Sequence, residues 1–306
     1  MKLASIDIGT NTILLLVAEV IQEQLRTLLD METVVGLGRG LQRSGLLSSE
    51  AMSRGYETLN QYMKRCRTMG VQKIYAVGTS ALREAKNSEE FTGKVKEKLN
   101  LPVEIISGEE EARLSFLAVA QDLRQPEERV LVVDVGGGSA EFILGRGDRM
   151  TEWVSLPLGS VRFTEQFLLS DPVKKEEWER MDKEIHRLLR DIPRSDRPPF
   201  MVAVGGTATT LASVGQRLKE FRVEKIHHFV LMKEDLAKQL SLYRSKTIEE
   251  RKKIAGLFPN RADVILAGGE ILYSAMEEAQ CSSALISCHG IRYGLLYQRF
   301  NLERRQ

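Results

Sequence analysis

The sequence predicts an α/β protein in which one domain is built twice. Two stretches carry this prediction, because residues 5–12 and 132–139 each run from an apolar strand through an aspartate into a turn of small residues. A second apolar stretch follows each turn, at 13–20 and 142–145. The turns lie about one domain length apart, and 306 residues hold about two domains of roughly 150 residues each.

Periodicity defines the elements of the first half. Alternating or β-branched residues predict strands, and apolar positions at helical spacing, such as Leu114, Leu117 and Ala118, predict helices. Ser107 followed by Glu110 forms a capping box that begins one of these helices. The expected elements are, in order, strands 3–8, 13–20 and 25–35, a helix near 49–69, strand 73–77, a helix near 88–99, strand 103–106 and the helix after Ser107.

A polar segment that contains Pro126 separates the two halves, because proline and clustered charges favour a loop. We therefore expect domains at 1–124 and 125–306, with the final helix, about 291–306, as a candidate to pack back on the first domain. The second half repeats the three-strand pattern at 130–135, 141–145 and 150–156. Its later elements are strands 200–204 and 284–287 and helices near 160–169, 174–192, 207–218, 233–244, 248–255, 261–279 and from 291.

The composition is that of an ordinary globular protein without a strong overall charge. With 44 basic and 42 acidic residues the net charge is +2, so any attraction for a polyanion must come from a local patch. The apolar stretch 13–20 is too short to span a bilayer, and nothing before it reads as a signal peptide. Three cysteines without CxxC spacing fit a reducing compartment. We expect a cytoplasmic protein without nucleic-acid or membrane partners, and a homodimer is left open.

The two aspartate–glycine turns are candidate phosphate sites. Glycine lets a ligand approach the backbone closely, and successive N–H groups form a concave nest for anion oxygens. The aspartate beside each turn can hold a hard divalent cation. The alternative is a tight β-hairpin that binds nothing. The candidate phosphate-binding residues are Gly9, Thr10, Asn11, Gly136, Gly137, Gly138 and Ser139, and the neighbouring candidate metal ligands are Asp7 and Asp134.

Two further glycine pairs occur in the second half. Gly205, Gly206 and Thr207 follow a buried strand and open a helix, whose N-terminus attracts phosphate. Gly268 and Gly269 lie inside a helical pattern, where paired glycines cost stability and indicate close approach to a ligand or to another helix. The sequence contains neither a Walker loop nor a G-x-G-x-x-G fingerprint, which disfavours a P-loop or Rossmann nucleotide site.

Charged side chains supply the candidate catalytic groups. Residues 109–111 are glutamates in the first turn of a helix, where they stabilise the N-terminus or supply a general base. Arg83 can hold a phosphate by charge-assisted hydrogen bonds, or be an ordinary exposed arginine. Two metal interpretations are weak. The adjacent His227 and His228 would not face one site on a strand, and Cys288 is better interpreted as a buried thiol.

Six segments together resemble the exopolyphosphatase/guanosine pentaphosphate phosphatase (Ppx/GppA) family, in its short two-domain form. They are IDIGTNT (6–12), VGTSALR (77–83), IISGEEEA (105–112), VDVGGGSAE (133–141), LPLGSVR (156–162) and RADVI (261–265). The resemblance implies two RNase H-like domains of the actin, sugar-kinase and Hsp70 ATPase superfamily around a central cleft, with phosphoryl groups bound between the glycine turns.

The resemblance also assigns roles to single residues. It implies that Glu111 is the catalytic glutamate, that Arg83 contacts phosphate, and that Asp134 and Glu141 lie near a Mg²⁺ ion and the attacking water. Two positions depart from the family pattern and are candidates to alter the cleft wall. His228 stands where many members have glycine, and Tyr293 replaces a usual acidic residue.

Residues and resemblance together predict a Mg²⁺-dependent phosphohydrolase. It would be an exopolyphosphatase that releases terminal phosphate from inorganic polyphosphate, with water activated by Glu111. A guanosine pentaphosphate 5′-phosphohydrolase is the alternative within the same reaction class. A kinase of the sugar-kinase type and an actin-like ATP-binding module are rivals of other kinds. The cations that could guide a polyanion, unless they are ordinary surface residues, are Arg39, Arg43, Arg217, Lys219, Arg222 and Lys225.

Overall fold

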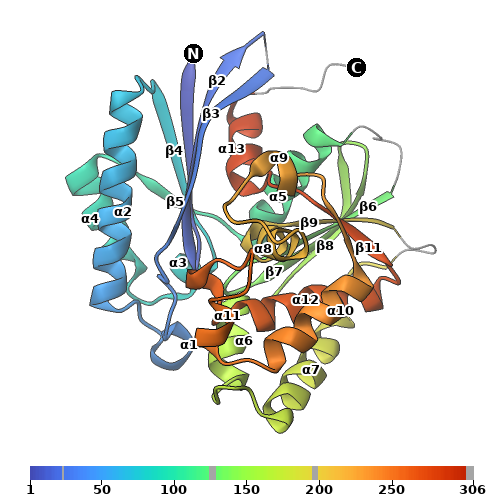
Figure 1. Cartoon of the computed structure of the whole chain (residues 1–306). Helices are drawn as coiled ribbons and strands as arrows, with labels where there is room; N and C mark the ends of the chain where they lie inside the picture. Colours follow the sequence, from blue (N-terminus) through green and yellow to red (C-terminus); the bar gives the residue numbers. More distant parts are fainter. Residues whose placement is uncertain (23, 124–128, 195–198, 301–306) are drawn as a thin grey trace. The chain divides into compact units, whose positions relative to one another are not determined.

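The computed structural model describes the chain except residues 23, 124–128, 195–198 and 301–306 (Figure 1). Its contacts divide it into two compact units. Unit 1 consists of Met1–Gln121 together with the segment from Ile291 onward, and unit 2 is Asp122–Gly290. The chain therefore passes from one unit to the other twice, after Gln121 and after Gly290. Within the described residues, none of the helices combines the length and the apolar character needed to cross a membrane.

Unit 1 is built on a five-stranded sheet in the order β3-β2-β1-β4-β5. The first three strands form an antiparallel meander, whereas β1 pairs in parallel with β4, and β4 with β5. Side chains alternate between the faces of a strand, so Ala4, Ile6 and Ile8 enter one apolar cluster and Leu3 enters another. The strands are β1 (Lys2–Ile8), β2 (Thr12–Ile21), β3 (Gln24–Val34), β4 (Lys73–Gly78) and β5 (Val103–Ile105).

Helices cover both faces of this sheet (Figure 1). The long amphipathic helix α2 (Ser49–Thr68) and α4 (Ser88–Leu99) pack on one face through residues such as Leu59 and Phe91. Ala118 of α5 and Leu296 of α13 belong to the cluster on the other face. The remaining helices of unit 1 are α5 (Gly108–Asp122), whose last residue belongs to unit 2, α13 (Ile291–Phe300) and the short α1 (Leu41–Ser44) and α3 (Ser80–Glu84).

Unit 2 is built on a six-stranded sheet in the order β10-β11-β9-β6-β7-β8. Strands β6, β7 and β8 form an antiparallel meander, β6 pairs in parallel with β9, and β9 with β11. The edge strand β10 is antiparallel to β11. The strands are β6 (Arg129–Val135), β7 (Ala140–Arg146), β8 (Arg149–Leu156), β9 (Phe200–Val204), β10 (Val230–Met232) and β11 (Ser283–Ile286).

One large apolar cluster joins the helices of unit 2 to its sheet. Its central helix is α12 (Ile265–Glu278), which is apolar on nearly every side and is therefore a core helix. The other helices are α6 (Ser160–Phe167), α7 (Lys175–Leu189), α8 (Gly205–Gly215), α9 (Val223–Ile226), α10 (Lys233–Arg244) and α11 (Ile248–Arg251), with a 3-10 turn at Pro259–Arg261.

The two sheets have the same topology. Strands β8-β7-β6-β9-β11 of unit 2 repeat the order and the directions of β3-β2-β1-β4-β5 in unit 1, and β10 is an addition at one edge. Both meanders carry a bulge between their second and third strands, at Val17/Ala18 and at Leu144/Gly145. The predicted α/β class with a duplicated RNase H-like unit is confirmed.

Some element bounds differ from the prediction. The helix expected at 261–279 starts only at Ile265, because the 3-10 turn Pro259–Arg261 precedes it. The helix expected at 207–218 starts at Gly205, whose φ of 86° suits glycine alone. Four helices and strands of three to five residues, α1, α3, α9 and β10, were not predicted, because so short a segment shows no periodicity.

Candidate functional site

The first aspartate–glycine turn joins β1 to β2 in unit 1. Gly9 N–H donates to the carbonyl of Thr12 at 2.9 Å, which closes the turn. Neighbouring loop amides hold it from outside, since Val35 and Gly36 both donate to the carbonyl of Asn11, at 2.9 and 2.8 Å. A Cβ on Gly9 would lie 3.1 Å from the Thr12 carbonyl, so a side chain there would crowd the turn.

The second turn joins β6 to β7 in unit 2 and is closed in the same way. Gly136 N–H donates to the carbonyl of Ser139 at 3.0 Å, and a Cβ on Gly136 would lie 3.0 Å from that oxygen. The start of α6 fixes the turn, because Val161 N–H donates to the Gly137 carbonyl at 2.9 Å and Arg162 Nε to the Gly138 carbonyl at 2.6 Å. The carbonyls of the turn are thus engaged by the protein.

The amides at the tips of both turns remain available. Within the described residues, the N–H groups of Thr10, Asn11, Gly137 and Gly138 have no protein acceptor. The side chain of Asn11 is 4% exposed, and neither of its amide atoms has a hydrogen-bond partner in the described part of the chain. Buried polar atoms are nearly always bonded, so this concentration of donors fits an anionic ligand better than an empty hairpin.

Two carboxylates stand beside the second turn. Asp134 and Glu141 are direct partners in the antiparallel β6–β7 pair, so their side chains are neighbours on one face of the sheet. Both are buried, and Ser155 Oγ donates to Glu141 at 2.8 Å. The third glycine turn lies against this pair, because a Cβ on Gly205 would be 2.8 Å from Asp134 Oδ1. In unit 1, Asp7 is likewise buried, at the end of β1.

A buried arginine that the sequence prediction missed covers the third turn. The guanidinium of Arg261 lies where a Cβ of Gly206 would be, so a side chain at position 206 would displace the guanidinium. Arg261 is 6% exposed and comes from the 3-10 turn before α12. It belongs to the RADVI segment, but nothing in that segment reveals which glycine its side chain reaches. The arrangement places a cation on the N-terminus of α8.

The fourth glycine pair serves helix packing. A Cβ on Gly268 would lie 2.7 Å from Thr207 Oγ1 of α8, and one on Gly269 would lie 3.0 Å from Leu240 of α10. Helix α12 can therefore approach both neighbouring helices closely. Of the two interpretations that the sequence left open for this pair, the contacts favour another helix over a ligand.

Glu111 and Arg83 form an ion pair in unit 1. Glu111 lies in the first turn of α5 and is 3% exposed, and Arg83 Nη1 donates to its carboxylate. The same nitrogen donates to the carbonyl of Ile106 at 2.7 Å, which fixes the position of the guanidinium. An adjacent cation favours the ionised form of a buried carboxylate, the form that a general base requires.

The other two glutamates of the run have different surroundings. Glu109 is exposed, whereas Glu110 accepts two hydrogen bonds of 2.8 Å from Arg113 and one of 2.7 Å from Gln298. Glu111 is therefore the one member of the run that is both buried and paired with Arg83. This distinction could not be made from three consecutive identical residues.

Tyr293, one of the two departures from the family pattern, is a core residue of unit 1. It is 4% exposed and joins the apolar cluster between β1, β2 and α13. Its hydroxyl lies 3.2 Å from both Thr27 Oγ1 and Asp30 Oδ2, and Arg292 donates two hydrogen bonds of 2.8 Å to Asp30. Burial raises the pKa of Tyr293 far above its ordinary value.

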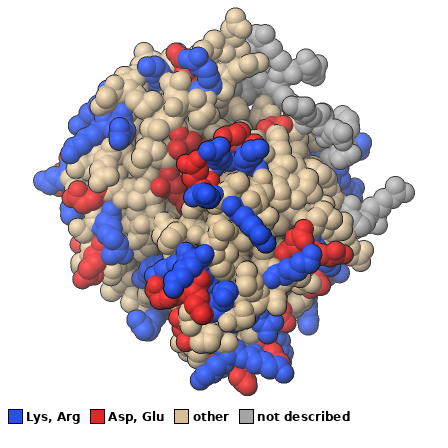
Figure 2. Space-filling view, in the orientation of Figure 1, with Lys and Arg blue, Asp and Glu red and all other residues tan. Residues whose placement is uncertain are grey.

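The candidate cations for a polyanion lie mainly at the surface. Arg43 is exposed in unit 1, and Arg217, Lys219 and Lys225 are exposed in unit 2, where Arg222 pairs with Glu220 at 2.5 Å. Figure 2 shows basic and acidic side chains intermingled on the face in view, without a large area of one sign. The +2 net charge agrees with this distribution.

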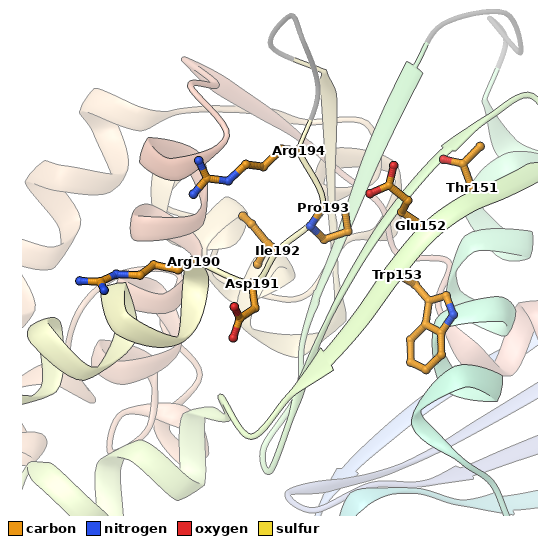
Figure 3. Close-up of a pocket in the computed structure, with 8 residues that line it drawn as sticks. All are labelled: Thr151, Glu152, Trp153, Arg190, Asp191, Ile192, Pro193 and Arg194. Carbon is orange, nitrogen blue, oxygen red and sulfur yellow. The ribbon is translucent and has the colours of Figure 1, made fainter.

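A cavity of 560 Å³ in unit 2 holds none of the predicted residues. It lies between residues 151–153 of β8 and residues 190–194. Figure 3 shows that the side chains of Arg190 and Arg194 point away from the strand, and that Trp153 points the other way. Because its charged groups do not converge, this cavity does not resemble a phosphate site.

Comparisons with known proteins agree with the geometry. The model of the Ppx/GppA phosphatase family matches residues 16–303. The crystal structure of the Aquifex aeolicus member of that family is 34% identical, with a TM-score of 0.83 over 100% of this chain and 99% of the other. An exopolyphosphatase from Cytophaga hutchinsonii is 27% identical, with a TM-score of 0.89 over 98% of both chains. The predicted resemblance is confirmed.

Proposed function

Because the chain belongs to the Ppx/GppA phosphatase family, we propose that it is a phosphohydrolase that releases terminal phosphate from inorganic polyphosphate. The observation that carries the proposal is the repeated turn, closed identically in both units, with tip amides that have no acceptor in the described part of the protein. Such donors suit the equatorial oxygens of a phosphoryl group, on which negative charge is spread during transfer.

Glu111 is the proposed general base. It would orient the attacking water and accept its proton as the bond to phosphorus forms and the bridging oxygen leaves with the shortened chain. Arg83 holds the carboxylate in place through the pair described above, and the second nitrogen of its guanidinium is proposed to contact a phosphate oxygen. In this proposal Glu111 accepts the proton, and Arg83 orients the carboxylate of Glu111.

Each turn is proposed to bind phosphate oxygens of the substrate through its tip amides. In unit 1 the donors are Thr10 and Asn11, because the N–H group of Gly9 closes the turn. In unit 2 they are residues 137–139, because the N–H group of Gly136 closes the turn, together with Gly205, Gly206 and Thr207 at the start of α8. Each turn is fixed by protein hydrogen bonds to its carbonyls, so its amides need no rearrangement when a phosphate binds.

Asp134 and Glu141 are the residues of unit 2 that are proposed to hold Mg²⁺, and Asp7 is the candidate metal ligand of unit 1. They fit the ion because Mg²⁺ prefers carboxylate oxygens and commonly uses one or two of them with substrate phosphates and water. The cross-strand pair of Asp134 and Glu141 provides two buried carboxylates beside a phosphate turn. When bound, Mg²⁺ would neutralise charge on the phosphate oxygens.

Polyphosphate is proposed as the substrate because the similar Cytophaga hutchinsonii protein is an exopolyphosphatase. A second reason is that Arg39 lies in a glycine-rich loop, which adjoins the first turn through the Gly38–Thr10 hydrogen bond of 2.9 Å, and that Arg43 follows in α1. Phosphate release from long-chain polyphosphate, guanosine pentaphosphate and ATP, measured side by side with Mg²⁺, tests the assignment. The highest kcat/KM on polyphosphate is expected. A higher value on guanosine pentaphosphate would assign the nucleotide, and release from ATP alone would indicate an actin-like ATPase.

A further inference from the structure

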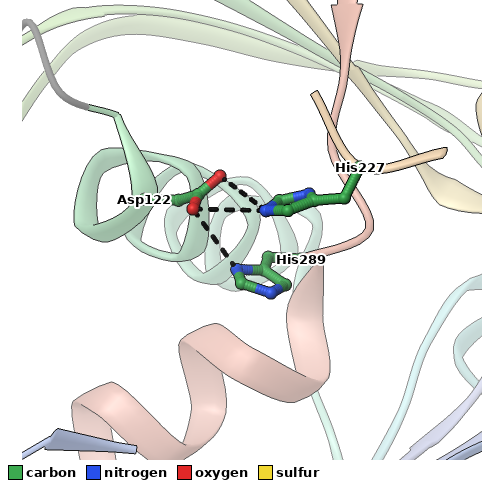
Figure 4. A group of neighbouring side chains, drawn as sticks. All are labelled: Asp122, His227 and His289. Carbon is green, nitrogen blue, oxygen red and sulfur yellow. Dashed lines mark hydrogen bonds and ion pairs between the residues drawn. The ribbon is translucent and has the colours of Figure 1, made fainter. Parts of the chain in front are cut away.

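Three of the four histidines of the chain gather around one carboxylate in unit 2. Asp122 accepts from His227 Nε2 at 3.3 Å through Oδ1 and from His228 Nε2 at 2.7 Å through Oδ2, and His289 Nδ1 lies 3.9 Å from Oδ1. The imidazole of His227 lies against both other rings, with centroids 3.9 Å from His228 and 4.4 Å from His289. Figure 4 shows Asp122, His227 and His289 pointing toward one another from three separate segments.

The sequence argument against a shared site for His227 and His228 is wrong for a local reason. The two residues follow α9 rather than lying on a strand, and His228 has a φ of 65°. This left-handed turn brings two adjacent side chains to the same carboxylate. Glycine would adopt that φ without strain, whereas a histidine there is strained. A strained side chain that reaches a half-buried carboxylate indicates a function for the cluster.

We propose that Asp122, His227 and His289 form a binding site for a divalent transition metal of the zinc class. One ligand atom from each residue lies within 4.8 Å of the other two. Ligands about 2.0–2.2 Å from a tetrahedral zinc ion lie about 3.4 Å apart, and the 3.2 Å between Asp122 Oδ2 and His227 Nε2 is already close to that separation. Two imidazoles and one carboxylate suit zinc, cobalt and nickel rather than Mg²⁺.

The surroundings suit a cation that exchanges with solvent. The side chains of Asp122, His227 and His289 are 15%, 16% and 20% exposed, so the site is sheltered but reachable. The imidazoles of His227 and His228 donate hydrogen bonds to the Asp122 carboxylate, which favours its ionised form. Three protein ligands leave one position for water.

Metal binding must displace one hydrogen bond of the present arrangement. Cys288 N–H donates to His227 Nδ1 at 3.1 Å, so the ring proton is on Nε2, which faces Asp122. A metal on Nε2 moves that proton to Nδ1, and the amide of Cys288 loses its acceptor. Affinity should therefore be lower than at four-ligand structural zinc sites.

The position of the site gives metal binding a structural consequence. Asp122 is the first residue of unit 2 and His289 lies one residue before its end, so both places where the chain leaves unit 2 supply a ligand. The loop between α9 and β10 supplies the third. A bound ion would tie these three segments together.

The test is titration of metal-free protein with Zn²⁺ by calorimetry and with Co²⁺ by visible absorption, in excess Mg²⁺ to fill oxygen-only sites. One equivalent should bind the natural protein. Asp122→Asn and His289→Ala should each weaken binding by at least about tenfold. His228→Gly should weaken it less, and His186→Gln, the one histidine outside the cluster, should leave it unchanged.

Thermal unfolding without metal first establishes that each variant is folded. In the natural protein Zn²⁺ should then raise the melting temperature, because a ligand that binds the native state stabilises it, and it should not do so in Asp122→Asn. Absence of binding to the natural protein would overturn the proposal. Binding that survives in both Asp122→Asn and His289→Ala, or that disappears in His186→Gln, would also overturn it. None of these readouts depends on phosphate release, so the phosphohydrolase proposal stands or fails separately.

Discussion

Arg83 and Glu111 are joined by a hydrogen bond from Nη1 of the guanidinium to the buried carboxylate. The carbonyl of Ile106 accepts from the same nitrogen, so the arginine is held from two sides. The pair links the short helix α3 to the first turn of α5. A buried carboxylate is thereby fixed in one orientation inside unit 1, which is the condition for positioning a water molecule.

Replacing Glu111 by Gln should abolish phosphate release while leaving the fold intact. The amide keeps the shape of the side chain but cannot accept a proton, and loss of a general base typically costs about two to four orders of magnitude in rate. Steady-state kcat for Glu109→Gln, Glu110→Gln and Glu111→Gln checks this. Similar small losses in all three would mean that the run only stabilises the helix N-terminus.

Replacing Arg83 by Met should lower kcat. The buried carboxylate of Glu111 loses the guanidinium that holds it in one orientation. Arg113→Met is the matched control, because Arg113 pairs with Glu110 instead. An unchanged kcat in Arg83→Met would show that the pair does not support the base.

Replacing Asp134 by Ala should raise the Mg²⁺ concentration required for half-maximal activity. A hard cation depends on carboxylate charge, and the loss of a group that supports a metal site typically costs about 10–100-fold in metal affinity. Rates across a Mg²⁺ titration measure the effect, with Glu152→Ala as an exposed carboxylate of the same unit for comparison. An unchanged titration would remove Asp134 from the metal site.

The salt dependence of activity should distinguish the two substrate classes. A long polyanion guided by exposed cations loses affinity as salt screens the charges, whereas a short nucleotide loses less. Values of kcat/KM on polyphosphate and guanosine pentaphosphate across a salt series are the measurement. The Arg39→Ala/Arg43→Ala and Arg217→Ala/Lys219→Ala double variants show which group acts. If the salt dependence of kcat/KM on polyphosphate is unchanged in both double variants, these cations are ordinary surface residues.

Glu270 should make unit 2 less stable as the pH rises. Burial, and then the charge of Asp182, raise the pKa of Glu270 from 4.5 to about 8. The folded protein thus binds a proton that the unfolded chain releases above about pH 4.5, so unfolding free energy falls between about pH 4.5 and 8, by at most about 1.4 kcal/mol per pH unit. Glu270→Gln should remove this slope in melting curves, whereas exposed Glu234→Gln should not. If the stability of the natural protein and of both variants depends on pH in the same way, the raised pKa of Glu270 is contradicted.

The parts of the site that the sequence predicted are those built from neighbouring residues. An aspartate, a glycine and a hydroxyl within six positions define a turn on their own, and both turns occur where the pattern places them. The parts that were missed depend on distant contacts. Arg261 covers Gly206 from another segment, and Asp122 meets His227 across 105 residues. A local sequence pattern does not predict such pairs, and it does not predict the left-handed φ at His228 either.

The contribution of α13 to unit 1 has a consequence for biosynthesis. Tyr293 and Leu296 complete the apolar cluster that contains Leu3 and Leu16 of β1 and β2. A ribosome makes this helix after unit 2, so unit 1 is completed only after the whole of unit 2 has been made. Unit 2 has all its residues before Ile291 is added and can fold while the chain is still attached. Until α13 emerges, the apolar surface around Leu3 and Leu16 stays uncovered in the nascent chain. Exposed apolar surface of this kind is what chaperones recognise.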